Sequence, residues 1–245
     1  MVTKTAVDYD TAHKMLQCCR EAYYMFSHNA EIREIPKGYR LVRHLRGTAL
    51  GKEFWYGLVL ESDDDIIVAF RGSQSDEDWL MDADILQTSF PYIHDGGLVH
   101  NGFLSIYHSL RDELVNTITD LDTEKEIFVT GHSLGGALAT LFILDIANVL
   151  RNLKQTLITF ASPKIGNKKF VERFNIIILD SYRFVNLNDV VPTFPPQLIH
   201  AKSLKTKLQY MHTPHPLSFS IDEGGLYKNH RLETYKKGIE KMFYK

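Results

Sequence analysis

A serine near the middle of the chain lies between two glycines at a spacing that suits nucleophilic chemistry. Residues 127–136 read IFVTGHSLGG, which places Gly131 and Gly135 two residues to either side of Ser133. The segment before the serine is short and apolar, as in a buried strand, and residues 134–151 have the length and character of a helix. A sharp strand-to-helix turn holds a serine hydroxyl clear of the backbone. The motif therefore predicts Ser133 as a nucleophile, and the alternative is a helix start whose glycines serve packing alone.

A serine hydroxyl is a weak nucleophile until a base takes its proton, and histidine is the usual base. Where this motif joins a strand to a helix, the acid and then the histidine follow the serine along the chain. The histidines after the serine are His200, His212, His215 and His230. Prolines around His212 and His215 predict an extended loop, whereas His230 lies at the start of a predicted terminal helix. We favour His230, and the others remain open.

An acidic residue is also needed to orient the histidine. Asp189 directly follows a predicted strand at 182–185, which puts its carboxylate in the loop at that strand's carboxyl end. Asp180 precedes the same strand and so lies at the opposite edge of the sheet. Asp222 remains an alternative.

The elements that must position these residues alternate along the chain. Strands at 54–61 and 66–70, joined by a polar loop, predict an antiparallel start, and residues 47–53 are expected to be loop. Strand and helix in alternation then indicate parallel βαβ units, whose ligands bind beyond the carboxyl ends of the strands. The expected strands are 127–130, 156–160 and 182–185, and the expected helices are 102–121, 134–151 and 167–174.

Length and composition limit the classes of protein that the chain can be. A chain of 245 residues with 44% hydrophobic content suits one α/β domain, residues 1–245, with a full core. The net charge of −2 gives no basic field of the kind that nucleic acid binding needs. The longest apolar stretch, Ala137–Leu150, is interrupted by Asp145 and is shorter than the roughly 20 residues of a membrane-spanning helix.

The start of the chain predicts a helix rather than a secretory signal. Residues 2–10 hold no apolar run, and residues 10–26 repeat apolar side chains at helical spacing. Cys18 and Cys19 are adjacent, so they cannot form an ordinary structural disulfide, and both are expected to be buried thiols. If the sequence is complete, these features predict a cytoplasmic protein.

Four motifs occur in the order that one known family shows. They are FRGS at 70–73, VHNGF at 99–103, TGHSLGG at 130–136 and NDVVP at 188–192. Together they resemble the class 3 lipase family, the fold of fungal triacylglycerol lipases, over about residues 54–235. The resemblance implies an α/β-hydrolase fold, with a mostly parallel central sheet flanked by helices and antiparallel strands at the start.

The same resemblance assigns expected roles to individual residues. Ser133 matches the nucleophile of the family, Asp189 its acid and His230 its base. Ser73 matches the oxyanion-hole residue, and the backbone N–H of Leu134 would be the second donor. His100 matches a position that we expect to be structural rather than catalytic.

The expected activity is hydrolysis of carboxylic esters, with triacylglycerol as the substrate, through an acyl-enzyme at a lipid–water interface. Neither a metal nor an organic cofactor is expected, and no H-E-x-x-H motif occurs. Phospholipase A1, mono- or diacylglycerol lipase and feruloyl-type esterase are alternatives on the same fold, because the motifs do not separate them. A lipase-like scaffold that binds without turnover is the alternative from another class.

A short lid is expected close to Ser73, where similar lipases carry theirs. Residues 75–86 read SDEDWLMDADIL, and an acidic residue three positions after Ser75 suits a helix start. Apolar side chains such as Trp79 and Leu86 would cover the site and meet lipid when the lid opens. The alternative is an ordered surface helix whose Trp79 belongs to the core.

Overall fold

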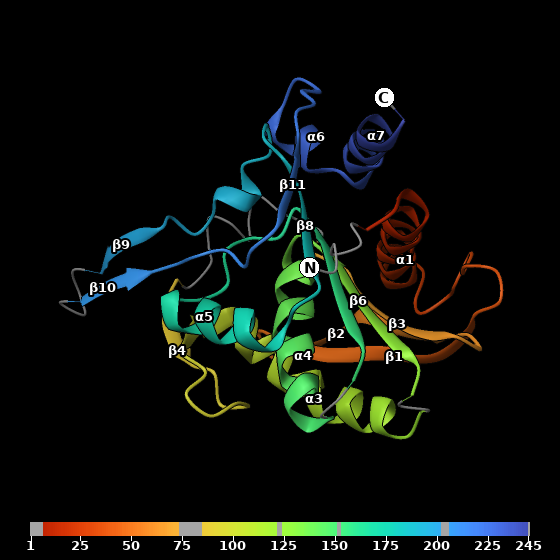
Figure 1. Ribbon diagram of the computed structural model, residues 1–245, viewed down its shortest axis with the longest axis horizontal. Coiled ribbons are helices and arrows are strands. Elements are labelled where there is room, and N and C mark those ends of the chain that lie inside the picture. Colours follow the sequence, from red (N-terminus) through yellow and green to blue (C-terminus); the bar gives the residue numbers. More distant parts are fainter. Residues whose placement is uncertain (1–6, 74–84, 122–123, 151–152, 202–205, 245) are drawn as a thin grey trace, which may run out of the picture.

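A seven-stranded sheet runs through the centre of the fold, in the order β1-β2-β3-β6-β7-β8-β11 (Figure 1). The computed structural model describes residues 7–73, 85–121, 124–150, 153–201 and 206–244. The strands are β1 (Arg40–Ala49), β2 (Lys52–Glu61), β3 (Asp65–Phe70), β6 (Glu126–His132), β7 (Gln155–Phe160), β8 (Ser181–Asn186) and β11 (Pro216–Phe219).

The first three strands of the sheet are antiparallel. β2 and β3 confirm the strands predicted at 54–61 and 66–70. The expectation of a loop at 47–53 was wrong, because Gly47 pairs with Phe54 in a long hairpin of β1 with β2. Leu50 and Gly51 form its turn with φ values of 50° and 73°, and two positive φ values are what a two-residue hairpin needs.

The other half of the sheet is parallel and follows the predicted alternation. β3, β6, β7 and β8 lie side by side in parallel register, and helices connect the last three. β11 adds a further parallel strand, which pairs with β8 from Pro216 opposite Arg183. The sequence did not predict β11, because its prolines suggested loop, and Pro216 is tolerated as the first residue of an edge strand.

Helices cover both faces of this sheet (Figure 1). On one face lie α3 (Asn101–Thr119), α4 (Leu134–Val149) and α5 (Lys168–Ile177), which confirm the three predicted helices within one to three residues. On the other face α1 (Tyr9–Ser27) packs beside α7 (Leu232–Phe243), from the opposite end of the chain. Each face therefore encloses its own hydrophobic core.

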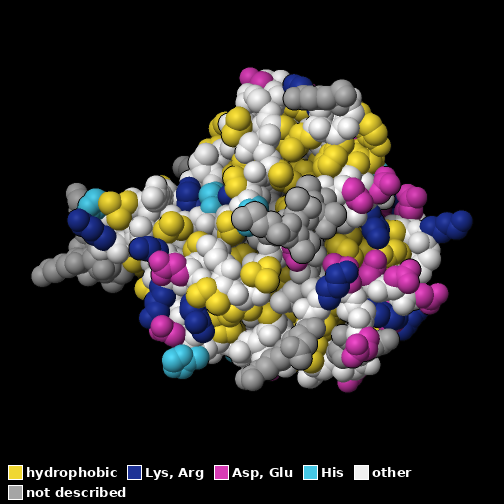
Figure 2. Space-filling model, in the orientation of Figure 1, with side chains coloured by type: hydrophobic (Ala, Val, Ile, Leu, Met, Phe, Trp, Pro, Cys, Tyr) yellow, Lys and Arg dark blue, Asp and Glu magenta, His cyan; other side chains and the backbone are white. Residues whose placement is uncertain are grey.

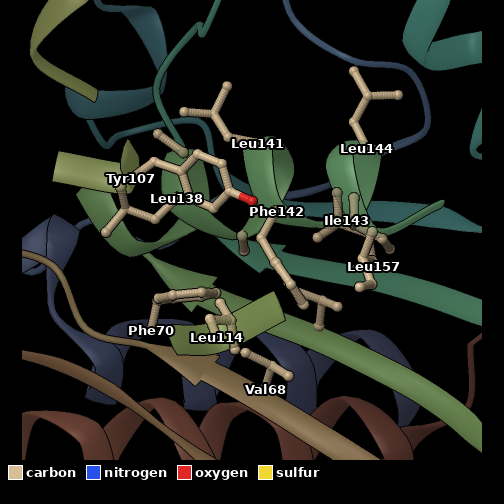
Figure 3. Packing of buried hydrophobic residues seen from close by; sticks show 14 of the residues in the cluster. Val68, Phe70, Tyr107, Leu114, Leu138, Leu141, Phe142, Ile143, Leu144 and Leu157 are labelled. Carbon is tan, nitrogen blue, oxygen red and sulfur yellow. The ribbon is translucent and has the colours of Figure 1, made fainter. Parts of the chain in front are cut away.

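The buried helix α4 forms the centre of the larger core. The Phe142 ring lies edge-on to the Phe70 ring of β3, with 6.2 Å between centroids (Figure 3). Asp145 interrupts the apolar run, and its carboxylate accepts hydrogen bonds from Tyr107 Oη at 2.6 Å and Arg111 Nε at 2.5 Å. The charge is thus paired, as a fully buried carboxylate requires.

The helix predicted at 10–26 is confirmed by α1, and both of its cysteines are buried. Burial raises the pKa of the Cys19 thiol to about 12, and Thr130 Oγ1 lies 3.4 Å from its sulfur. A thiol in this environment packs as a small apolar side chain rather than as a nucleophile.

Shorter elements lie at the edges of the fold. The β9–β10 hairpin extends away from the body of the molecule (Figure 1). The small α6 helix precedes α7 at the carboxyl edge of the sheet. These elements are β4 (Gln87–Ser89), β5 (Leu98–His100), the 3₁₀ helix η1 (Val191–Thr193), β9 (Leu198–Ala201), β10 (Thr206–Gln209) and α6 (Leu226–His230).

The surface has no uniform character. Figure 2 shows hydrophobic side chains gathered where α6 and α7 lie, whereas Lys, Arg, Asp and Glu are interspersed over the opposite end of the same face. Among the described helices, none is both long enough and apolar enough to span a bilayer.

Candidate active site

The candidate nucleophile lies on a tight turn between β6 and α4. Ser133 has φ 57° and ψ −129°, a conformation that a non-glycine residue rarely adopts. A Cβ atom at Gly131 would lie 2.1 Å from the carbonyl oxygen of Gly135, and one at Gly135 would lie 2.4 Å from that of Phe70. The turn can close this tightly only with glycine at both positions. The Ser133 N–H donates to the Phe160 carbonyl at 3.0 Å, which fixes the turn to β7.

The candidate acid and base meet as a buried pair. His230 Nδ1 lies 2.7 Å from Asp189 Oδ2, with side chains that are 3% and 0% exposed. The carboxylate also accepts the hydroxyl proton of Tyr235 at 2.8 Å and the Val191 N–H at 2.9 Å. Because Asp189 accepts at Nδ1, the neutral histidine carries its proton there, and Nε2 is the nitrogen with the lone pair that a general base needs.

Further hydrogen bonds join the loop after β8 to the segment that carries the histidine. The Asn186 side chain donates to the carbonyl oxygens of Ile221 and Asn229 at 2.9 and 3.1 Å. Asn229 Nδ2 in turn donates to the Asn188 carbonyl at 3.1 Å. The Tyr235 oxygen accepts the Asn186 N–H at 3.2 Å. The positions of the acid and the base are therefore coupled through three asparagines and one tyrosine.

A second histidine supports the first from the nucleophile turn. His132 Nε2 lies 2.8 Å from the His230 carbonyl oxygen, and its Nδ1 lies 2.9 Å from the Tyr23 hydroxyl of α1. Burial and the neighbouring His230 lower the pKa of His132 well below its ordinary value, so the ring is neutral. Since a carbonyl oxygen only accepts, Nε2 carries the proton and Nδ1 accepts from Tyr23.

The predicted oxyanion-hole residues flank the serine. Ser73 follows Gly72, where a Cβ atom would lie 2.7 Å from that of Ser133. Arg71 fixes this segment, because its guanidinium donates to the Gly72 carbonyl at 2.5 Å. Leu134 is the first residue of α4, so its N–H has no carbonyl of the same helix to bind. Ser73 therefore follows a residue that packs against Ser133, and Leu134 directly follows the serine; their role as an oxyanion hole stays a prediction.

A cavity of about 350 Å³ opens beside the candidate base. It joins residues from α1, the segment after β3, β6, and the α6–α7 region. Its lining residues are Tyr23, Ser73, His132, Tyr227, His230, Arg231 and Leu232. Within the described ranges, no group of His, Cys, Asp and Glu side chains has an arrangement that could hold a metal ion.

The structure places the alternative histidines elsewhere. His200 lies in β9 and His215 is exposed before β11. His212 Nε2 lies 2.6 Å from the Pro192 carbonyl oxygen, and burial lowers the pKa of His212 to about 3. His230 is the histidine that binds Asp189.

The alternative acid and the histidine of the VHNGF motif also have structural partners. Asp222 is bound to Asn229 Nδ2 at 3.1 Å. His100 caps α3, where its Nδ1 accepts the Gly102 N–H at 3.1 Å and its ring stacks on Phe103. The expected structural role of His100 is confirmed.

Most of the predicted lid, with Trp79, lies outside the described residues, which resume at residue 85. Leu86 is 38% exposed, and its carbonyl oxygen accepts the Asn101 N–H at 2.8 Å and the Tyr210 hydroxyl at 3.3 Å. The lid at 75–86 stays a prediction.

Sequence reasoning missed three residues that bind the site. His132 was visible only as the variable position of the serine motif. Tyr235 lies in α7, the helix after the one that ends at His230, so helical spacing does not relate the two residues. Tyr23 comes from α1, 109 positions before His132, and no local pattern connects the two.

A nucleophile turn between a parallel strand and a helix, followed along the chain by the acid and then the histidine, defines the α/β-hydrolase architecture. A family model described as lipase (class 3) matches residues 67–199, more than half of the chain. The chain therefore belongs to the class 3 lipase family.

Relatives in this family carry several activities in their names. The chain is 35% identical to a lipase from Rhizomucor miehei over 142 residues, which cover 56% of this chain and 39% of that protein. It is 28% identical to phospholipase A1-Igamma2, chloroplastic, from Arabidopsis thaliana over 248 residues, with coverages of 78% and 46%. It is 33% identical to secreted mono- and diacylglycerol lipase A from Penicillium cyclopium over 133 residues, with coverages of 53% and 43%. The chain spans about half the length of these relatives.

Solved structures of fungal lipases share the fold. The Rhizomucor miehei lipase propeptide complex superposes with a TM-score of 0.71 at 24% identity, over 88% of this chain and 70% of that chain. Lipase II from Rhizopus niveus gives a TM-score of 0.71 at 23% identity, over 88% and 81%. The predicted α/β-hydrolase fold is confirmed.

Proposed function

We propose that this chain hydrolyses the carboxylic esters of lipids, with triacylglycerols as the first class to test, through Ser133, His230 and Asp189. The observation that supports the proposal most is the buried hydrogen bond of 2.7 Å between His230 Nδ1 and Asp189 Oδ2. It accompanies a serine on a tight strand-to-helix turn and a cavity lined by the same histidine.

The reaction begins when His230 Nε2 takes the proton of the Ser133 hydroxyl as its oxygen attacks the ester carbonyl carbon. Asp189 stabilises the imidazolium that forms and holds its ring in place. The tetrahedral intermediate collapses, the bond to the alcohol oxygen breaks, and His230 gives its proton to the departing alcohol. Water then attacks the acyl-enzyme with His230 as base, and the carboxylic acid is released.

Negative charge develops on the carbonyl oxygen during both attacks. The N–H of Leu134 and the Ser73 segment supply donors beside that oxygen, and the start of α4 adds the positive end of its dipole. In other hydrolases the loss of one such donor costs about 10²-fold or more in kcat. Side chains, backbone N–H groups and water supply the groups used in these steps.

The names of the relatives leave the substrate class open between neutral and charged lipids. Lipase and mono- and diacylglycerol lipase indicate neutral glycerides, and phospholipase A1 indicates esters with a phosphate group. One observation in the cavity, the arginine beside the histidine, favours the second class.

The proposal is tested by replacing each member of the triad and measuring hydrolysis of tributyrin. Ser133→Ala, Asp189→Asn and His230→Ala should each lower kcat by at least about 10³-fold, because the three residues act as one unit. Combining two of the changes should cost little more than the larger single loss.

Matched controls come from the residues that the structure places elsewhere. His215→Ala and Asp180→Asn should keep near-native kcat. Near-native turnover in His230→Ala or Asp189→Asn would rule out the proposed assignment.

A further inference from the structure

Among the described residues that line the cavity beside the histidine, Arg231 is the one with a formal charge. Of the other lining residues, His132 is held neutral by burial, and the rest are serine, tyrosine, leucine and the base itself. Arg231 directly follows His230, and its carbonyl oxygen accepts the N–H groups of Thr234 and Tyr235 at 3.0 and 3.2 Å. These hydrogen bonds fix the backbone of Arg231 beside the cavity.

The guanidinium is held in place without a carboxylate. Its central carbon lies 4.4 Å from the centre of the Tyr227 ring, and Tyr227 is 46% exposed. Stacking on an aromatic face leaves the N–H groups in the guanidinium plane free to bind a further group. Arginine binds phosphate and carboxylate through two parallel N–H groups in this plane, and the stacked geometry allows that binding.

The two glutamates nearest to Arg231 in the sequence pair with other cations. Glu233 pairs with Arg20 of α1 at 3.5 Å, and Glu223 pairs with Lys237 at 2.8 Å. In the part of the chain that the structure describes, Arg231 has no ion pair. The guanidinium of Arg231, beside the candidate catalytic cavity, can therefore bind an anionic group of a ligand.

The direction of proton transfer determines which half of an ester would contact Arg231. His230 must donate its proton to the departing alcohol oxygen, so the alcohol lies on the histidine side of the serine. The acyl carbonyl lies on the other side, toward Ser73 and Leu134. A group next to His230 therefore contacts the alcohol, not the acyl chain.

We propose that Arg231 binds a phosphate group on the alcohol half of the substrate, so that acyl esters of glycerol phosphate are cleaved in preference to acyl esters of glycerol. The inference rests on the proposed function, because it uses the direction in which His230 transfers its proton. It names glycerophospholipids as the substrate class of the same site.

Repulsion from carboxylates of the protein would oppose the binding of a phosphate group. Residues 76–84, which follow Ser73 closely in the sequence, include five carboxylates. At 0.15 M salt the Debye length is about 8 Å, so distant charges are screened while a direct contact is not. Measurement at this ionic strength isolates the contribution of Arg231.

The test compares two dissolved esters that differ only in the phosphate, 1-butyrylglycerol 3-phosphate and 1-butyrylglycerol, each without an interface. Butyrate release gives the ratio of kcat/KM for the phosphorylated ester to that for the neutral ester. The full chain should favour the phosphorylated ester, and Arg231→Gln should lower the ratio by about 10-fold or more, as expected for a lost charge-assisted pair. The ratio for Arg231→Lys should lie between these two values, because lysine keeps the positive charge but lacks the paired N–H donors of the guanidinium.

Lys228→Gln is the matched control, since it removes one positive charge from exposed α6 by the same replacement. Its ratio should equal that of the unchanged protein. An equal ratio in Arg231→Gln, or an equal fall in Lys228→Gln, would overturn the role of Arg231 while leaving the ester hydrolase intact. Failure of the unchanged protein to cleave either ester, or cleavage that survives Ser133→Ala, would instead overturn the proposed function and the inference with it.

Discussion

The hydrogen bonds around Asp189 have a direction that follows from the chemistry of each group. Burial and the charge of Asp189 raise the pKa of Tyr235 well above its ordinary value, so the tyrosine remains a donor. The Asp189 carboxylate accepts hydrogen bonds from His230, Tyr235 and Val191, so Nδ1 of His230 acts as a donor. Ser133, Asp189 and His230 could be proposed from the sequence because a motif and the order of the chain marked them. Tyr235 and His132 were not, because their contacts exist only after distant segments have folded together.

A partly buried histidine, His212, predicts how the stability of the fold responds to acid. The pKa of His212, about 3 in the folded protein, lies below the ordinary value of 6.5, chiefly because burial disfavours the charged ring. Above pH 6.5 both the folded and unfolded states are neutral at this residue, so it contributes no pH dependence. Below pH 6.5 the unfolded state binds the proton, and the free energy of unfolding falls by up to about 1.4 kcal/mol per pH unit.

His212→Gln should remove this slope while it keeps a donor for the Pro192 carbonyl. The free energy of unfolding is measured in urea at pH 7, 6 and 5 for both proteins. Between pH 7 and pH 5 the variant should gain about 2 kcal/mol relative to the unchanged protein. A difference that stays constant with pH would show that His212 is not held neutral.

At the scale of elements, β6, the serine turn and α4 act as one unit whose geometry depends on close backbone contact. Gly135→Ala would place a Cβ atom 2.4 Å from the Phe70 carbonyl oxygen and 2.7 Å from that of Arg71. Because these contacts are with backbone, the strain cannot be relieved by a side-chain rotation. We expect a loss of about 1–3 kcal/mol in the free energy of unfolding and a fall in kcat, because Ser133 moves with the turn.

Gly225→Ala supplies the comparison, since nothing lies within 4 Å of its added Cβ atom. Thermal unfolding and tributyrin hydrolysis should be near native for Gly225→Ala and impaired for Gly135→Ala. Equal behaviour of the two variants would contradict the close packing of the turn.

The elements that were predictable differ physically from those that were not. The inner strands β6, β7 and β8 are short apolar runs between helices, which is how strands buried on both faces read. β1 lies at the edge, and its sequence RLVRHLRGTA mixes charged and apolar residues without a clean alternation. β11 has only four residues and begins with proline. Both edge strands are defined by the neighbour with which they pair, and a single sequence does not show that neighbour.

At the scale of the molecule, the segments that carry the candidate acid and base also carry exposed apolar side chains. Leu187, two residues before Asp189, is 68% exposed, and Leu226, four residues before His230, is 61% exposed. Both follow the carboxyl ends of parallel strands, the edge at which the site lies. We expect this edge to contact lipid, since burying such side chains is favourable by roughly 1.5–3 kcal/mol each.

The double variant Leu187→Ser with Leu226→Ser should lose activity on emulsified tributyrin and keep most of it on dissolved tributyrin. The matched control is Ile176→Ser with Leu179→Ser, because these residues are 67% and 68% exposed but precede β8 at the opposite edge of the sheet. Equal losses of emulsion activity in the two double variants would show that the site edge has no special affinity for lipid.

Ser133 is proposed to be an activated nucleophile, and covalent labelling tests this directly. A fluorophosphonate probe, followed by digestion and mass spectrometry, should modify the protein at Ser133. The unchanged protein should react stoichiometrically, Ser133→Ala should not react, and His230→Ala should react far more slowly because its serine lacks a base. Absence of labelling in the unchanged protein, or labelling that persists on another residue in Ser133→Ala, would contradict the account.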